Sequence, residues 1–197
     1  MSGGTSEEAT NNRRLVIGIS GSSGPQLGIA LLRTLRELGT VETHLVVSDG
    51  ARVTIPLETD TTAQDVEAMA DVVYKADDLG AAISSGSFLT MGMAIVPCSM
   101  KTLAAVASGY TSDLLSRAAD VTLKERRRLV LVPRETPLSL IHLRNMVTVT
   151  EAGAVILPPV PAFYHRPKTI PDLLHHTVGK VLDQFGIEHQ EFDRWEG

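Results

Sequence analysis

Short apolar runs alternate with longer segments of helical period from residue 14 to residue 186. The apolar, β-branched runs predict strands at 15–20, 42–48, 93–98, 128–134 and 153–159, and favour a short sixth strand at 71–76. The segments between them predict helices at 25–38, 62–70, 100–107, 112–124, 137–151 and 170–186. This alternation is typical of a mostly parallel sheet with helices on both faces. The expected fold class is therefore an α/β three-layer sandwich.

Composition fits one compact domain and narrows the range of partners. The chain has 197 residues with 43% apolar content, enough for one substantial core. We expect residues 1–12 to form a disordered tail that lacks signal-peptide features, and residues 13–197 to form the domain. The net charge of −5 disfavours nucleic acid and anionic membranes as partners, and no apolar run is long enough to span a membrane. The single cysteine suits a reducing compartment such as the cytoplasm.

Polar or glycine-rich segments follow each of the five main predicted strands, at 21–24, 48–50, 99–102, 134–136 and 159–167. In an open parallel sheet, all these segments lie at the carboxyl edge, where ligands bind at the switch in strand order. The sequence therefore predicts a single anion-binding cleft at that edge.

The first of these segments belongs to the stretch "IGISGSSGPQLG", residues 17–28. Its glycine spacing matches neither the dinucleotide fingerprint nor the P-loop. Gly21 and Gly24 allow a tight turn, Ser22 and Ser23 add hydroxyls, and the free amides of the next helix favour an anion. The alternative is an ordinary strand-to-helix turn. Asp49 is better explained as a helix cap or solvated turn residue than as a ribose ligand.

Two further segments carry candidate chemistry. Ser99 and Thr102 bracket a strand-to-helix turn that also holds Lys101. Arg134 and Glu135 stand at the end of an apolar strand and have two possible interpretations. They form either a catalytic pair, in which Arg134 binds phosphate and Glu135 moves a proton, or a local ion pair.

The remaining charged and sulfur-containing residues are better explained by structural roles than by catalysis or ligand binding. We expect the arginines at 126–128 to lie on a solvated face and Cys98 to be a buried structural thiol. The six histidines show no metal-ligand spacing.

Taken together, "GISGSSG", "VETHLVVS", "SSGSFLTMGMAIVPCSMKTLAAVASGYTSDLLSRAADVTLKERR", "LVLVPRETPLSLIHLRNM", "GAVILPPVPAFYHRP" and "VLDQFGI" resemble the UbiX-type flavin prenyltransferases. The resemblance extends from about residue 14 to residue 195. It implies a Rossmann-like (flavodoxin-like) single domain that alkylates reduced FMN at N5 and C6 with dimethylallyl monophosphate, without a metal. The product, prenylated FMN, would serve a partner UbiD-type decarboxylase.

The resemblance also implies roles for individual residues. FMN contacts fall on Gly21, Ser22, Ser23, Ser48, Ser99, Met100, Lys101, Thr102 and Arg134. The prenyl phosphate site falls on Ser23, Arg117, Lys124, Tyr164 and Lys180, with Trp195 as a nearby aromatic and Glu135 as the proton-handling carboxylate. Ser23, Glu135, Lys124 and Arg117 form the expected catalytic set. Ser23 would touch both ligands.

Three departures from the family pattern bear on these roles. Lys180 stands where arginine is usual, which keeps the charge but loses the bidentate fork. Ser22 and Pro25 replace common alanines, and Phe88 stands where some members have tryptophan.

The resemblance further implies a homododecamer with shared active sites, in which the C-terminal helix and tail pack on a neighbouring subunit. The alternative function is a non-catalytic carrier of FMN or prenylated FMN, or an accessory subunit of a hydroxyaryl acid decarboxylase. Direct decarboxylation by the chain itself would need a superfamily motif that "PCSMKT" does not provide.

Overall fold

The computed structural model describes residues 13–195, so the predicted tail at 1–12 lies outside the described residues. Six strands form one parallel sheet in the order β3-β2-β1-β4-β5-β6. They are β1 (Arg14–Ile19), β2 (Glu42–Val47), β3 (Val72–Tyr74), β4 (Gly92–Cys98), β5 (Arg128–Pro133) and β6 (Val155–Ile156). All five predicted strands and the short sixth are confirmed, although β6 is much shorter than expected.

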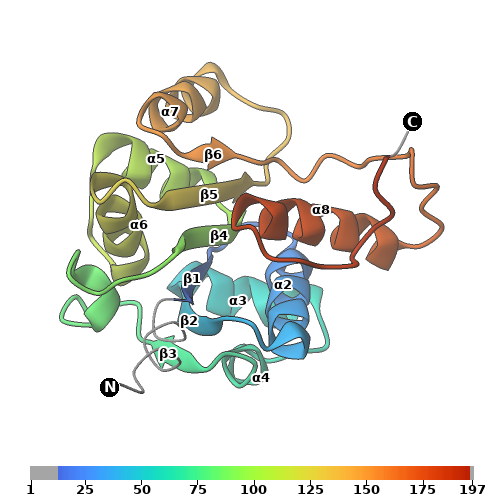
Figure 1. Ribbon diagram of the computed structural model, residues 1–197. Helices are drawn as coiled ribbons and strands as arrows, with labels where there is room; N and C mark the ends of the chain where they lie inside the picture. The colour runs from blue at the N-terminus through green and yellow to red at the C-terminus, as the bar shows by residue number, and fades with distance from the viewer. Residues whose placement is uncertain (1–12, 196–197) are drawn as a thin grey trace, which may run out of the picture.

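Helices cover both faces of the sheet (Figure 1). They are α2 (Pro25–Leu38), α3 (Asp49–Glu58), α4 (Ala63–Glu67), α5 (Met100–Ser108), α6 (Leu114–Lys124), α7 (Leu140–Glu151) and α8 (Ile170–Gln184), with a 3-10 turn, η1 (Ala82–Ser84). One core contains side chains from α2, α3, α4 and α8, and the other contains side chains from α5, α6, α7 and η1. The two cores on opposite faces establish the predicted three-layer sandwich.

Alternate residues of the buried strands face the two cores. On β1, Leu15, Ile17 and Ile19 belong to the first core, whereas Val16 belongs to the second. Strands buried on both faces have near-continuous apolar sequences, and this is why these runs stand out in the chain.

The strand order reverses between β1 and β4. Ser20, directly after β1, is buried and links the two strand ends: its Oγ donates to the Pro97 carbonyl at 2.9 Å and accepts from the Ser99 amide at 2.7 Å. A reversal of this kind opens a crevice at the carboxyl edge of the sheet. The fold therefore places the segments after β1 and β4 side by side.

Two predictions about helices need correction. No helix was expected at 49–58, where α3 forms despite Pro56 in its interior. The helix expected from residue 137 begins at Leu140, because the Ser139 hydroxyl caps it by accepting from the His142 amide at 3.2 Å. The second half of α8 packs into the core of its own chain through Val178, Val181 and Leu182, and packing of the exposed part of α8 and the tail on a neighbouring subunit stays a prediction.

Candidate active site

The turn after β1 and the first turn of α3, which follows β2, touch each other at two glycines. A Cβ atom on Gly21 would lie 2.7 Å from the Cα and carbonyl carbon of Gly50, closer than real side-chain contacts allow. Gly24, with φ of 93°, adopts the left-handed conformation directly before α2. The glycine turn is thus required for the close approach of two backbones as well as for the turn itself.

Serine hydroxyls cap the two helices that begin at this edge. Ser48 Oγ accepts from the Ala51 amide at 3.2 Å, and Ser99 Oγ accepts from the Thr102 amide at 3.3 Å. The hydroxyls of Ser99 and Thr102 lie 3.1 Å apart. Of the two roles suggested for Asp49, a helix cap or a solvated turn residue, the first is wrong, because Ser48 is the cap and Asp49 is the exposed first residue of α3.

A cavity of about 300 Å³ opens where these loops meet. Its lining includes five residues predicted to contact FMN: Gly21, Ser48, Ser99, Lys101 and Thr102. Asp49, Gly50, Ala76, Asp77, Ser112 and Asp113 complete the lining. The predicted convergence of strand-end segments is observed here for the loops after β1, β2 and β4.

The donor set at this cavity fits a flavin mononucleotide. Ser22 Oγ is buried and has no hydrogen-bond partner among the described residues, so it is available to a ligand. The Lys101 ammonium and the N-terminal amides of α5 favour a phosphate, while Gly21 leaves room for a close backbone contact. Ser22 and Ser23 follow Gly21 in the turn after β1, Met100 precedes Lys101, and Arg134 follows β5, but none of these four residues lines the cavity.

The start of α2 is already occupied by a carboxylate of the chain itself. Glu58, at the end of α3, accepts hydrogen bonds through Oε2 from Ser23 Oγ at 3.0 Å and from the Gly24 amide at 2.9 Å. The expectation of free amides at this helix start is therefore wrong for Gly24. Sequence reasoning missed Glu58 because no helix was expected at 49–58, so its side chain could not be placed beside the glycine turn.

Arg134 and Glu135 directly follow β5 and are both exposed. The Arg134 amide donates to the Cys98 carbonyl at 3.3 Å, which fixes this loop to the end of β4. Glu135 Oε1 accepts from the Thr136 amide at 2.9 Å. No ion pair joins the two side chains in the part of the chain that the structure describes, so their charged ends remain available to a ligand.

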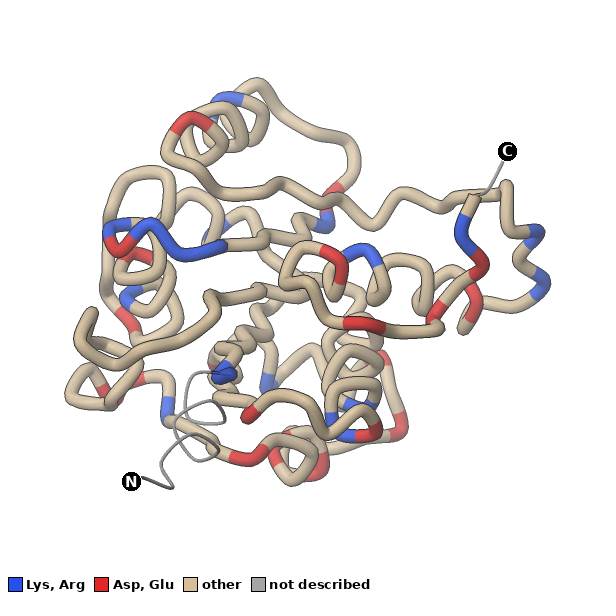
Figure 2. The backbone as a smooth tube through the Cα atoms, viewed as in Figure 1, with Lys and Arg blue, Asp and Glu red and all other residues tan. Residues whose placement is uncertain are grey.

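The predicted phosphate cations on α6 hold a loop instead of facing the cavity. Arg117 Nε donates to the Ser84 carbonyl at 3.2 Å, and its guanidinium pairs with Asp120 at 2.8 Å. Lys124 pairs with Glu125 beside Gly86 of the same loop. Figure 2 shows the basic run where α6 passes into β5.

The arginines at 126–128 do not form a wholly solvated face. Arg127 is half-buried and donates to the carbonyls of Gly86 and Phe88 at 2.6 and 2.7 Å. This correction leaves Arg126 and Arg128 as the exposed members of the run.

Tyr164, Lys180 and Trp195 gather at the other end of the molecule. The rings of Tyr164 and Trp195 meet edge to face with centroids 6.2 Å apart. Tyr164 Oη lies 3.2 Å from Nε2 of His176, which precedes Lys180 by one turn of α8. Burial, followed by the nearby charges of His165 and Lys180, lowers the pKa of His176 below its ordinary value.

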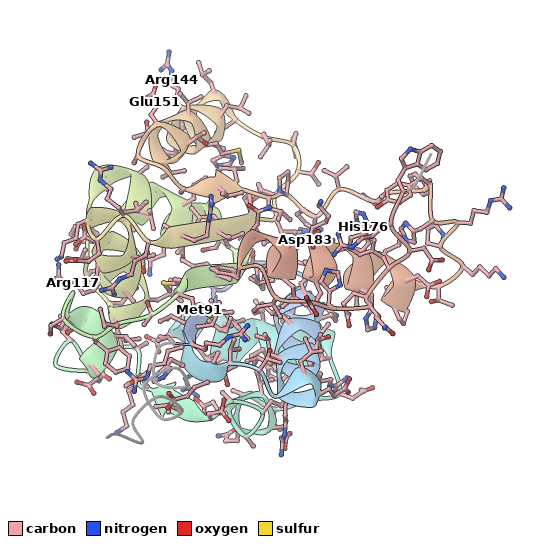
Figure 3. The ribbon with its side chains drawn as sticks, in the orientation of Figure 1. Met91, Arg117, Arg144, Glu151, His176 and Asp183 are labelled. Carbon is pink, nitrogen blue, oxygen red and sulfur yellow. The ribbon has the colours of Figure 1, made fainter. Side chains whose placement is uncertain are left out.

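The predicted donor site is therefore divided between two places in one chain. Figure 3 shows Arg117 and His176 on opposite sides of the molecule. Arg117 and Lys124 lie with the loop at 84–88, whereas Tyr164, Lys180 and Trp195 lie with α8. A single chain does not bring the five residues together.

Cys98 is buried at the end of β4, and burial raises the pKa of its thiol to about 12. The prediction of a structural thiol is confirmed, because a thiol with this pKa is almost entirely protonated at neutral pH. Within residues 13–195, no group of three His, Cys, Asp or Glu side chains is arranged to hold a metal ion. No helix in that range is long and apolar enough to cross a membrane.

A parallel sheet with a switch point, a glycine turn and capped helices around one small cavity defines an α/β protein that binds a mononucleotide. The sequence matches the Flavoprotein family over residues 4–182. It is 57% identical over 187 residues to flavin prenyltransferase UbiX of Escherichia coli strain K12, covering 94% of this chain and 99% of that protein. The chain belongs to the UbiX-type flavin prenyltransferases of the Flavoprotein family.

Two solved structures show the same fold. The crystal structure of AnUbiX (PadA1) in complex with FMN and dimethylallyl pyrophosphate has a TM-score of 0.92 and 57% identity, over 94% of this chain and 98% of that one. A dodecameric FMN-dependent UbiX-like decarboxylase from Escherichia coli O157:H7 has a TM-score of 0.91 and 55% identity, over 93% of this chain and all of that one.

Proposed function

We propose that this protein transfers a dimethylallyl group from dimethylallyl monophosphate to reduced FMN and releases prenylated FMN. The observation that carries the proposal is the combination of an FMN-type cavity at the strand ends with the additional residues Lys124, Glu135 and Tyr164. A protein that only stored flavin would need the cavity but not these three.

The cavity residues hold the flavin. Ser48, Ser99 and Thr102 supply hydroxyls, and Lys101 supplies a cation for the FMN phosphate. Ser22, which follows Gly21 outside the cavity lining, offers an unpartnered hydroxyl. Bound in its reduced form, FMN would supply N5 as the nucleophile that replaces phosphate at the allylic carbon and C6 as the atom that would add to the prenyl double bond, with the protons of N5 and C6 released. Arg134, which is exposed and whose amide is bonded to the Cys98 carbonyl at the end of β4, is the proposed additional phosphate or flavin contact, together with Met100 and the Gly21–Ser23 turn.

The second group of residues handles the donor. Tyr164 and Lys180 are the proposed phosphate ligands from α8 and the loop before it, and Arg117 and Lys124 are the proposed ligands from α6. Fixed cations stabilise the charge that develops on the departing phosphate, and the aromatic ring of Trp195 shields the allylic carbon from water. Glu135 is the proposed group that accepts the proton displaced from the flavin.

We further propose that two subunits complete one donor site. The separation of Arg117 from His176 within the chain supports this arrangement, as does the dodecameric state of the Escherichia coli O157:H7 relative. A homododecamer would bring α6 of one subunit to the α8 end of another. A UbiD-type decarboxylase is the proposed recipient of the product, and the single cysteine of the chain, which cannot form an intramolecular disulfide, supports a location in the reducing cytoplasm.

The decisive experiment is anaerobic incubation of the protein with FMN, dithionite and dimethylallyl monophosphate, followed by mass spectrometry of the released flavin. We expect a mass increase of one dimethylallyl unit, and a parallel reaction with the pyrophosphate shows which donor is preferred. Recovery of unmodified FMN alone, while a known relative reacts in the same buffer, would overturn the enzyme proposal. It would favour the alternative, a carrier of FMN or prenylated FMN for a partner decarboxylase.

A further inference from the structure

The C-terminal segment, residues 188–195, runs back along α8 after the helix ends (Figure 1). The segment lies so close to α8 at Gly179 that a Cβ atom there would come within 2.6 Å of the rings of Phe192 and His189. Only glycine leaves room for this contact. The docking of the segment is therefore part of the packing of α8.

One carboxylate on α8 connects the helix to this segment. Asp183 Oδ1 lies 2.7 Å from Arg194 Nη2 and 3.1 Å from His189 Nε2. Its other oxygen lies 3.3 Å from Arg194 Nη1 and 3.6 Å from Lys180 Nζ. Burial opposes ionisation of Asp183, but the hydrogen bonds from Arg194 and His189 outweigh it, so the pKa of this carboxyl lies below its ordinary value.

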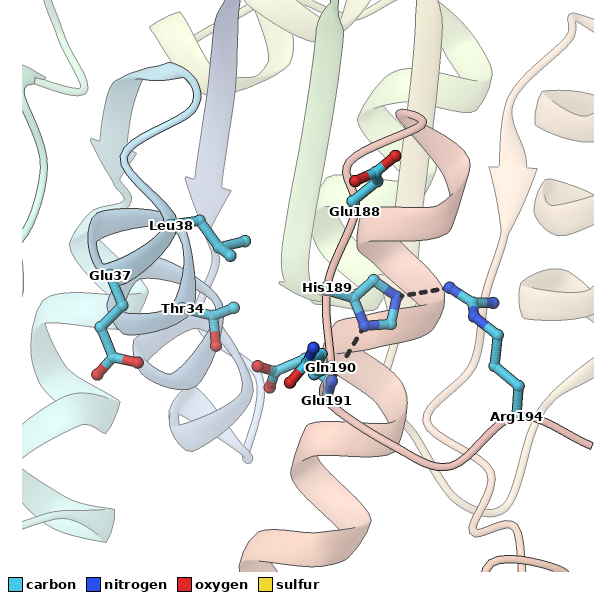
Figure 4. A pocket seen from close by; sticks show the side chains of 8 residues that line it. All are labelled: Thr34, Glu37, Leu38, Glu188, His189, Gln190, Glu191 and Arg194. Carbon is cyan, nitrogen blue, oxygen red and sulfur yellow. Dashed lines mark hydrogen bonds between the residues drawn. The ribbon is translucent and has the colours of Figure 1, made fainter.

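The opposite side of the segment faces open space. A cavity of about 590 Å³ separates it from α2 and is lined by Thr34, Glu37 and Leu38 of that helix (Figure 4). Glu188, His189, Gln190, Glu191 and Arg194 line the other wall. The polar contacts that fix the segment therefore come mainly from α8, where His175 also pairs with Glu191.

The docked segment carries an aromatic connection to Tyr164. Phe192 packs on His176 with ring centroids 4.7 Å apart, and Arg194 stacks on Phe192 at 5.6 Å. The next residue is Trp195, whose ring meets Tyr164. Asp183 therefore fixes Arg194, and through it the residue that lies against Tyr164.

We propose that Asp183 is a positioning residue for the donor site. It anchors the C-terminal segment through Arg194 and His189, so that Trp195 lies against Tyr164, and it holds the neighbouring Lys180 ammonium on the same side of α8. This inference rests on the proposed function, because it assigns Tyr164, Lys180 and Trp195 to donor binding. The geometry that carries it is the shared carboxylate and the close passage at Gly179.

The test uses Trp195, the only tryptophan in the chain, as a reporter. Time-resolved fluorescence anisotropy of the full-length oligomer separates slow overall tumbling from fast motion of a loosened segment. We expect Asp183→Asn to increase the amplitude of the fast component at least twofold. The same variant should raise KM for dimethylallyl monophosphate roughly three- to tenfold, as expected for a partly exposed charge-assisted contact, with kcat changed less than twofold.

The control is Asp193→Asn, which removes the same charge from an exposed residue one position before Arg194. It should leave both measurements at wild-type values. Arg194→Gln removes the partner instead of the anchor, and the double variant should be no worse than the more impaired single variant, because both residues act through one contact. If Asp183→Asn does not fold, Arg194→Gln alone carries the test.

Unchanged anisotropy and KM in both single variants would overturn the inference, even with an active wild-type enzyme. Loss of kcat at unchanged KM and unchanged anisotropy would also overturn it. A wild-type protein that makes no prenylated FMN overturns the proposed function instead. In that case the anisotropy of Asp183→Asn, together with calorimetric titration of the wild-type and variant proteins with dimethylallyl monophosphate, still decides whether Asp183 positions the segment for binding.

Discussion

Ser23 donates its hydroxyl hydrogen to Glu58, with Oγ and Oε2 3.0 Å apart. The hydroxyl hydrogen is then committed, so Ser23 Oγ can act toward a ligand only as a hydrogen-bond acceptor. The sequence suggested that Ser23 would offer a donor to phosphate. The observed contact instead favours a ligand group that carries hydrogen, and places a carboxylate beside the turn where a phosphate was expected.

Ser23→Ala and Glu58→Ala should therefore have similar effects. We expect each to lower kcat by about tenfold or more, because each removes the oriented Ser23 lone pair, and to change FMN affinity less than threefold. The double variant should match the more impaired single variant, since the two residues form one contact. Anaerobic single-turnover kinetics and FMN titration measure the two quantities. Additive effects would show that Glu58 acts independently of Ser23.

Glu135→Gln should keep FMN bound but slow product formation by about 10² or more, the usual contribution of a positioned acid or base. Glutamine retains an oxygen that accepts from the Thr136 amide, so the loop conformation should persist. The measurement is the rate of prenylated FMN formation by mass spectrometry, alongside the absorbance of bound flavin. Equal rates in variant and wild type would remove Glu135 from the mechanism.

Lys180→Arg should lower KM for the prenyl phosphate by roughly two- to fivefold, because a guanidinium can grip phosphate through two hydrogen bonds. Lys180 is exposed and lies 3.6 Å from Asp183, so a longer, planar side chain has space to extend toward the donor. Arg33→Lys, on the surface of α2, is the control: it exchanges one basic residue for the other away from the donor site and should leave KM unchanged. A higher KM in Lys180→Arg would show that the site is built around the ammonium.

The fold could be predicted because its strands are buried on both faces. Runs such as Leu15–Ile19 are apolar throughout, and the helices between them have clear periodicity. The exception, α3, contains Pro56 and exposes Val53 and Leu57, so its pattern does not resemble an amphipathic helix. Because α3 was not predicted, Glu58 could not be placed from the sequence, although it contacts Ser23 and Gly24 of the glycine turn directly.

The candidate site was predictable only where it consists of adjacent loops. Gly21, Ser48 and Ser99 follow neighbouring strands, so topology alone brings them together. The contacts of Arg117 with Ser84 and of Asp183 with Arg194 depend on the reach of long side chains and on the path of a distant loop. The hydrophobic periodicity of the sequence contains information about neither.

His44 should make the protein less stable in mild acid. Burial lowers the pKa of this imidazole, against the opposing pull of the Glu42 carboxylate, and Nδ1 lies 2.9 Å from Tyr74 Oη. An unfolded chain binds the proton first as pH falls below about 6.5, so stability is complete above that pH and is lost on acidification toward the lower folded pKa. The slope from this group is at most about 1.4 kcal/mol per pH unit.

Urea unfolding at several pH values between 5 and 7.5, at one protein concentration, measures this slope. His44→Gln should reduce it, because glutamine does not titrate. His176, whose pKa is also lowered, should account for part of the remaining dependence, and His176→Gln provides the comparison. Parallel slopes in His44→Gln and wild type would mean that His44 has no part in the acid sensitivity.

Cys98 should be inert to thiol reagents in the folded protein. Its side chain is fully buried at the end of β4, its Sγ lies 3.6 Å from the Ser99 carbonyl, and burial raises the pKa to about 12. At pH 8 the thiolate fraction is then about 10⁻⁴, and a reagent must also wait for the strand end to open. We expect labelling by 5,5′-dithiobis(2-nitrobenzoic acid) to take hours in native buffer and seconds in denaturant.

Cys98→Ala should leave the prenylation rate within twofold of wild type, because the thiol faces the core containing Leu103 and Leu131 and not the flavin cavity. Rapid labelling that stops when FMN is added would instead place the thiol at the ligand.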